Sequence, residues 1–295
     1  MIRRTEIDSF GVLALTAFAL HLAFNQVVIK VTAGGFSPVF AAGVRSAGAV
    51  IVLLVWMYLR GVSLRMPRAA LPWAVVSGLL FAIEFICLYN ALDLTTVSRS
   101  SVIFYSMPLW LALASVVLLP DERLTRRKAL GLALAFGGVV IALSDRSGGH
   151  VSWAGDLLAL CAALAWGGIA LLVRVTPLAD VPSEQQLISQ VIISAPVLLL
   201  LAPLFGPMVR EVQPIHIAGM LFQIIAVGSF GYLIWFGLMK RYPANGVASF
   251  SFISPVASVV MGWLLLGERI APTIWIALVM VAIGITLINR RARAH

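Results

Sequence analysis

Apolar residues occur in long runs along this chain, and the polar residues gather in short groups between the runs. A helix needs about 20 apolar residues to cross the hydrocarbon core of a bilayer. On that spacing the pattern predicts ten membrane-spanning helices, at residues 10–31, 37–59, 70–92, 96–118, 127–144, 153–174, 186–205, 214–239, 245–266 and 272–290. The connections between them are short, so we expect an all-α polytopic membrane protein with no separate domain outside the bilayer.

The amino-acid composition also indicates a membrane protein. Hydrophobic residues make up 61% of the chain and charged residues 11%, with a mean hydropathy of +1.02, which is outside the range of soluble domains. A net charge of +9 would suit a nucleic-acid binder, yet the Lys and Arg residues stand singly or in short clusters at the ends of the apolar runs, the pattern that sets membrane topology. We therefore expect the lipid bilayer as a partner and no nucleic acid.

The same basic residues predict an orientation. When the ten spans are alternated across the bilayer, Lys and Arg are about three times as numerous on the side that holds both termini, and positive residues are retained in the cytoplasm. Both termini are therefore expected in the cytoplasm. Cys87 and Cys161 both lie inside predicted spans, where we interpret them as small apolar side chains. Neither a metal site nor any other cofactor is expected.

The chain contains an internal repeat. The segment "SMPLWLALASVVLLPDERL" is similar to the later segment "ISPVASVVMGWLLLGERI", so that Pro108 matches Pro255, Glu122 matches Glu268 and Gly138 matches Gly284. The repeat divides the chain into residues 1–146 and 147–295, with five predicted helices in each half. An odd number of crossings inverts the second half, and inverted repeats with a site between them are typical of secondary transporters. The alternative is a duplication without transport, as in a structural membrane protein.

These paired segments, with "LYNAL" and "LIWFGL" before them, resemble the EamA-type repeat of the drug/metabolite transporter superfamily. The first half departs from the pattern, with Pro120-Asp121 where a Gly is usual. The resemblance implies a bacterial inner-membrane carrier with a cavity lined by helices 1–4 and 6–9 and with helices 5 and 10 at the periphery. It also implies small-molecule substrates: amino acids, nucleotide sugars, sugar phosphates or cationic drugs. In length and aromatic content the chain is most similar to bacterial exporters of aromatic amino acids, so amino acids that are aromatic or otherwise hydrophobic are the expected cargo.

Four polar residues lie deep within the predicted spans. At a rise of about 1.5 Å per residue, Asn25, Arg45 and Glu84 share one level in the outer half of the bilayer, and His21 lies one turn deeper on the same helix face as Asn25. Ionisable groups inside a membrane usually face a cavity or a partner. They could bind a charged or zwitterionic substrate, with Arg45 on a carboxylate and Glu84 on an ammonium group. Alternatively, Glu84 pairs with Arg45, or is protonated and bonds to Asn25, and only holds helices together, while Arg45 extends to the surface. His21 is either a proton carrier or a neutral hydrogen-bonded side chain.

Aromatic residues and two prolines complete the candidate site. Pro108 and Pro255 predict helix kinks, which serve either gating or packing. Aromatic side chains in mid-span, away from the interfaces where Trp and Tyr concentrate, could form a wall against an apolar ligand or merely pack: Tyr89, Tyr105, Trp166, Tyr232, Trp235 and Phe252.

The function that these observations favour is a secondary carrier that exports small metabolites by alternating access, as a monomer or a homodimer. A multidrug or nucleotide-sugar carrier of the same superfamily is the alternative substrate class. A channel or an intramembrane enzyme is the alternative mechanism. The sequence disfavours the enzyme, because it contains no HExxH and no GxSxG spacing.

Overall fold

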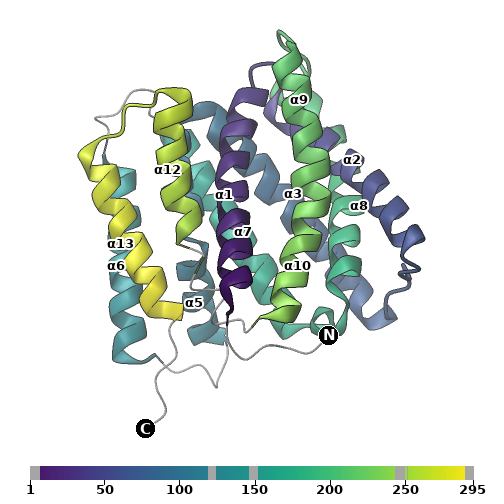
Figure 1. The fold of residues 1–295 in the computed structure, drawn as a ribbon, viewed down its shortest axis with the longest axis horizontal. Helices are drawn as coiled ribbons and strands as arrows, with labels where there is room; N and C mark the ends of the chain where they lie inside the picture. The colour runs from purple at the N-terminus through teal and green to yellow at the C-terminus, as the bar shows by residue number, and fades with distance from the viewer. Residues whose placement is uncertain (1–6, 119–123, 146–151, 243–249, 251, 290–295) are drawn as a thin grey trace.

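The computed structural model is a bundle of helices that run roughly alongside one another (Figure 1). It describes residues 7–118, 124–145, 152–242, 250 and 252–289. Long helices make up most of it: α1 (Ser9–Thr32), α2 (Pro38–Leu59), α3 (Leu71–Leu94), α6 (Arg126–Ser144), α7 (Trp153–Val175), α8 (Ser183–Leu201), α12 (Ile253–Leu266) and α13 (Pro272–Asn289). Three short 3₁₀ segments flank them: η1 (Arg68–Ala70), η2 (Pro177–Asp180) and η3 (Ala202–Phe205).

Two of the membrane spans are not regular α-helices. The fourth is broken into α4 (Val97–Phe104) and α5 (Met107–Leu118). The eighth begins as α9 (Pro214–Phe222), continues as a π-helix, η4 (Gln223–Gly231), and ends as α10 (Tyr232–Arg241). A π-helix closes i→i+5 hydrogen bonds and is frequent at functional sites.

The helix predictions are largely confirmed. Within the described residues, nine helices are long and apolar enough to cross a membrane. The ninth predicted span, 245–266, is represented by α12 alone, because residues 243–249 and 251 lie outside the described part, and α12 is shorter than the others. The first copy of the Glu-Arg motif, Glu122-Arg123, also lies outside it. Large apolar side chains face outward along many helices, as expected where lipid is the solvent. The start of α1 and the end of α13 lie at the same end of the bundle (Figure 1).

Local sequence determines where several helices begin and end. Asp8 accepts a hydrogen bond from the Gly11 amide at the start of α1, and Thr96, Thr125 and Ser152 cap α4, α6 and α7 in the same way. Such side chains satisfy amides that have no partner inside the helix. At the other end of α12, Gly267 has a φ of 64°, a left-handed conformation that glycine adopts without strain.

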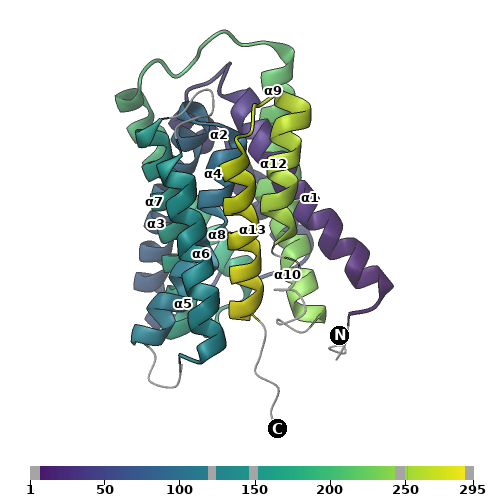
Figure 2. The same ribbon diagram turned by 90° about the vertical axis from the view of Figure 1, so that its left-hand side faces the viewer.

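The helices pack in pairs that cross the two halves of the sequence. The α3 helix packs against α7 and α8, α2 packs against α8, and α1 packs against α12 (Figure 2). The α6 and α13 helices form the most extensive pair, at one side of the bundle. Their close approach depends on glycine: a Cβ on Gly131 would lie 2.8 Å from the Gly284 carbonyl oxygen, and a Cβ on Gly138 would lie 2.8 Å from the Ala277 carbonyl oxygen. Small residues allow helix backbones to approach closely in membranes.

A Gly284→Ala substitution tests this contact. Its Cβ would lie 2.6 Å from the Gly131 carbonyl oxygen and 2.7 Å from the Ala135 amide nitrogen, so the two helices must separate. We expect the free energy of unfolding to fall by about 1–3 kcal/mol, the usual cost of overpacking, measured by thermal unfolding in detergent. The control is Gly237→Ala, whose Cβ would meet nothing within 4 Å and whose helix propensity improves. A Gly284→Ala variant as stable as this control would contradict the prediction.

Candidate functional site

Two buried side chains of opposite charge lie near each other inside the bundle. Arg45 on α2 and Glu84 on α3 are 2% and 5% exposed, and they are close enough to interact electrostatically. No described residue forms an ion pair or a hydrogen bond with the Glu84 carboxylate, and the Arg45 Nε is also without a hydrogen-bond partner. The Arg45 guanidinium carbon lies 4.2 Å from the centroid of the Phe85 ring, a cation–π contact. The direct Arg45–Glu84 pair, one of the alternatives from the sequence, is therefore not formed in this structure.

A hydrogen-bonded chain borders this pair. The Tyr89 hydroxyl donates to the Gln223 Oε1 at 2.5 Å, the Gln223 Nε2 donates to the Thr32 Oγ1 at 2.9 Å, and the Thr32 hydroxyl donates to the Val28 carbonyl at 2.7 Å. The chain connects α3, the π-helix and α1. Sequence reasoning named Tyr89 and missed Gln223, because a glutamine within an apolar run carries no signal of which distant helix it will contact.

The π-helix brings its backbone close to the charged pair. A Cβ on Gly228 would lie 3.5 Å from the Arg45 Nε. His21 on α1 has its Nε2 3.1 Å from the Ala226 carbonyl oxygen, and its ring lies against Phe222 with 5.3 Å between the ring centroids. His21 is thus a hydrogen-bonded side chain that ties α1 to the π-helix. Asn25, one turn further along α1, is buried with its Oδ1 unpartnered.

A second polar group lies around the break in the fourth span. The Tyr105 hydroxyl, between α4 and α5, faces Gln26 of α1 and Ser254 and Ser258 of α12. Pro108 is the second residue of α5, where its missing N–H leaves no helix bond unmade, and the kink predicted for it is this break. Pro255 lies in the first turn of α12.

Four of the six predicted aromatic residues lie in one apolar core: Tyr89, Tyr105, Trp166 and Tyr232. In that core the Trp166 ring stacks on Phe104 at a centroid distance of 5.0 Å. The Tyr232 ring lies 6.5 Å from that of Phe81 in the same core. Trp235 instead stacks on Phe18 at 5.0 Å, in a separate cluster with Leu15, Leu238 and Tyr242, and Phe252 is 38% exposed. The structure thus brings four of the six together.

One end of the bundle holds the turn between α3 and α4, and we call it the α3–α4 end. Charged side chains there form hydrogen bonds with the backbone carbonyls and amides at the helix termini. The Lys30 Nζ donates to the carbonyls of Asp93 (3.1 Å) and Thr95 (3.0 Å) at the end of α3. The Glu268 carboxylate accepts from the amides of Val97 (2.6 Å) and Ser98 (2.9 Å) at the start of α4. Glu268 belongs to the repeated Glu-Arg motif, and sequence reasoning gave it no role.

Two ion pairs lie at the same end. Arg99 on α4 forms a bidentate pair with Asp156 on α7, with Nε–Oδ1 at 2.7 Å and Nη2–Oδ2 at 2.8 Å, and the two side chains are 3% and 0% exposed. Arg210 forms a pair with Asp93 that is 36% and 25% exposed. Hydrogen bonding to Asp93 raises the pKa of Arg210, which keeps it charged.

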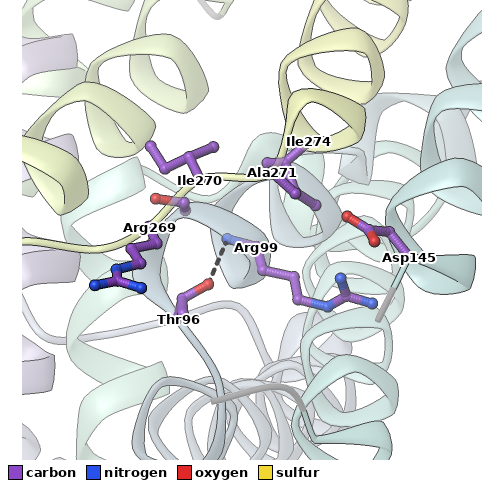
Figure 3. Close-up of a pocket in the computed structure, with 8 residues that line it drawn as sticks. Thr96, Arg99, Asp145, Arg269, Ile270, Ala271 and Ile274 are labelled. Atoms are coloured by element: carbon purple, nitrogen blue, oxygen red, sulfur yellow. Dashed lines mark hydrogen bonds between the residues drawn. The ribbon is translucent and has the colours of Figure 1, made fainter. Parts of the chain in front are cut away.

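A small pocket opens beside Arg99 (Figure 3), and Thr96, Asp145, Arg269 and Ile274 are among its lining residues. None of the candidate site residues predicted from the sequence lines it. The pocket therefore belongs to the α3–α4 end and is separate from the Arg45–Glu84 pair.

Comparisons with known proteins give a consistent result. The model of the EamA-like transporter family matches the chain twice, over residues 9–144 and 153–290. The Escherichia coli (strain K12) protein named "Uncharacterized inner membrane transporter YedA" is 25% identical over 97% of this chain and 92% of that protein. The protein of the same organism named "Probable amino-acid metabolite efflux pump" is 26% identical over 93% of each. A solved crystal structure superposes with a TM-score of 0.65 at 24% identity, over 92% of this chain and 94% of that one, a likeness of fold alone.

The two ion pairs of the α3–α4 end are expected to differ in their contribution to stability. Asp156→Asn leaves the Arg99 guanidinium buried without its counter-ion, and we expect a loss of about 3–5 kcal/mol of stability. Asp93→Asn, the matched control, breaks a partly exposed pair and is expected to cost at most about 1 kcal/mol. Thermal unfolding in detergent measures both, and equal destabilisation by the two variants would argue against the structural role of the buried pair.

Proposed function

The chain belongs to the EamA-like transporter family, and on that premise we propose that it is a secondary transporter that exports amino acids by alternating access. That it is a multi-pass membrane transporter of small metabolites, in the bacterial inner membrane, follows from the family, the apolar helices and the relatives. The amino-acid cargo, the export direction and the mechanism are the parts that we propose.

The observation that carries the proposal is the burial of Arg45 and Glu84 near each other without an ion pair between them. Burying an ion without a partner costs several kcal/mol, and charged residues inside a membrane are costly to place there. An amino acid carries the complementary charges. Its carboxylate suits the guanidinium fork of Arg45, which binds carboxylates through two hydrogen bonds, and its ammonium group suits the Glu84 carboxylate. The cargo then supplies each of the two residues with a hydrogen-bonded counter-ion.

The aromatic core beside this pair supports a hydrophobic or aromatic side chain on the cargo. Phe85 and Phe81 lie with their ring centroids 4.6 Å apart, and Tyr89 and Tyr232 belong to the same core. Binding sites for small molecules are typically lined by such apolar surfaces with a few polar groups that fix orientation. The name of one relative, an amino-acid metabolite efflux pump, points to the same class.

The two halves, residues 1–146 and 147–295, are the elements that we propose to move against each other. Side chains of the candidate site come from both: Arg45 and Glu84 from the first, Tyr232 from the second. In inverted-repeat carriers the site lies between the halves, and rocking of one against the other exposes it to each side in turn.

Substitution of the charged pair tests the site. We expect Arg45→Gln and Glu84→Gln each to lower amino-acid transport in proteoliposomes at least tenfold, because a hydrogen bond to a charged group contributes about 1.5–3 kcal/mol. The matched controls are Arg65→Gln and Glu211→Gln, which make the same changes at exposed positions. Full transport by both site variants, with the controls also active, would reduce Arg45 and Glu84 to structural roles.

A thermal-shift screen separates the substrate classes. A ligand that binds the folded protein at a hundred times its Kd adds about 2.7 kcal/mol to stability. We expect amino acids to raise the unfolding temperature of the purified protein, and nucleotide sugars and cationic drugs to leave it unchanged. A shift with either of these two, and none with amino acids, would favour the alternative classes of cargo. Saturable counterflow of the cargo would distinguish a carrier from a channel.

A further inference from the structure

A group of uncharged polar side chains lies buried where α1, the α4–α5 break and α12 meet. Gln26 is 3% exposed, Tyr105 7%, Ser254 5% and Ser258 0%. The Tyr105 hydroxyl faces the other three. These four residues, which we call the neutral subsite, come from both halves of the chain, and no Asp, Glu, Lys or Arg is among them.

Two polar atoms of the neutral subsite lack a hydrogen-bond partner, while the Ser254 hydroxyl donates to the Ala19 carbonyl at 3.3 Å. The Gln26 Oε1 and the Ser258 Oγ form no hydrogen bond, and neither does the Ser101 Oγ one turn from Tyr105. Of the other buried glutamines, Gln190 donates from its Nε2 to the Ser77 Oγ at 2.8 Å, and the Gln185 Oε1 is unpartnered as well. The great majority of buried polar side-chain atoms have a partner, so a group of exceptions at one place requires an explanation.

The neutral subsite adjoins the charged pair. Tyr232 interacts electrostatically with Tyr105 on one side and with Arg45 and Glu84 on the other. The Trp166 ring lies 6.3 Å from the ring of Tyr105. The neutral subsite therefore lies on the side of Tyr232 toward which we expect a cargo held by Arg45 and Glu84 to extend.

We propose that the neutral subsite binds a hydroxyl or amide group at the side-chain end of the amino acid whose charged end is held by Arg45 and Glu84. This inference rests on the proposed function and deepens it by naming the preferred cargo. Hydroxyl and amide side chains both donate and accept hydrogen bonds, so they match a neutral group that does the same. A site built to bind such a group rejects an analogue that lacks it, because its own polar atoms are then left unpaired.

Two pairs of amino acids of nearly equal size provide the test. Transport of tyrosine is compared with phenylalanine, and of threonine with valine, in proteoliposomes that contain the full-length protein. We expect the hydroxyl member of each pair to be favoured about tenfold or more. Gln26→Leu and Ser258→Ala are each expected to lower that preference by about 2- to 10-fold, the effect of one neutral hydrogen bond, with transport of phenylalanine and valine retained.

The matched controls are Gln190→Leu and Ser194→Ala. Both residues are buried, and their side chains are already hydrogen-bonded inside the protein, so the preference should not change. Ser258→Ala removes only the hydroxyl oxygen among the heavy atoms. It can therefore be tested even if Gln26→Leu impairs folding.

Each outcome has a distinct meaning. Amino-acid transport without a preference for the hydroxyl members overturns the neutral subsite and leaves the proposed function in place. So does a preference that neither variant changes, or an equal loss for both members of a pair, which indicates a structural role. Absence of transport for every amino acid overturns the proposed function itself.

Discussion

The buried turn between α3 and α4 is the constraint on which the arrangement of the bundle depends. Only Thr95 and Thr96 separate the two helices, and Thr95 is fully buried. The last carbonyls of α3 and the first amides of α4 have no partner within their own helices, and the burial of the turn keeps water from replacing one. Lys30 supplies the donor and Glu268 the acceptor. A cation at a helix C-terminus and an anion at an N-terminus are also the signs that the helix dipoles favour. Because α3 carries Glu84 and Tyr89, and α4 leads to Tyr105, this turn positions much of the candidate site.

The charged groups at the α3–α4 end and at the centre of the molecule differ in how they are paired. At the α3–α4 end, charges meet counter-charges or helix termini, as in the Arg99–Asp156 pair. At the centre, Arg45 and Glu84 lie near each other without bonding, and the Gln26 Oε1 has no partner. A fold that needed these polar groups only for stability would have paired them, since a buried unpaired group costs about 1–3 kcal/mol or more. Buried polar groups that lack partners at the centre are what the proposed binding site for a polar cargo requires.

The sequence predicted what depends on local pattern and missed what depends on distant partners. The apolar runs gave the fifth and sixth spans as 127–144 and 153–174, and the structure has Arg126–Ser144 and Trp153–Val175. Helical rise placed Arg45 and Glu84 together, but it could not show that they remain unbonded. The π-helix was not predicted, since no residue type in Gln223–Gly231 requires i→i+5 bonds. The role of Glu268 was missed because Val97, its partner, lies in the other half of the chain.

The symmetry of the repeat is preserved in the contact between α6 and α13 and is lost at the candidate site. The α6–α13 contact is symmetric: Gly131 meets Gly284 just as Gly138 meets Ala277. Glu84, however, matches Gly231, the last residue of the π-helix, where a Cβ would lie 2.8 Å from the Ala226 carbonyl oxygen. At this position the second half has space for no side chain, whereas the first half has the Glu84 carboxylate. An amino acid has one positive and one negative group and no two-fold symmetry, so a symmetric site would leave one of two carboxylates unmatched and buried. The loss of symmetry at this position fits the zwitterionic cargo that we propose.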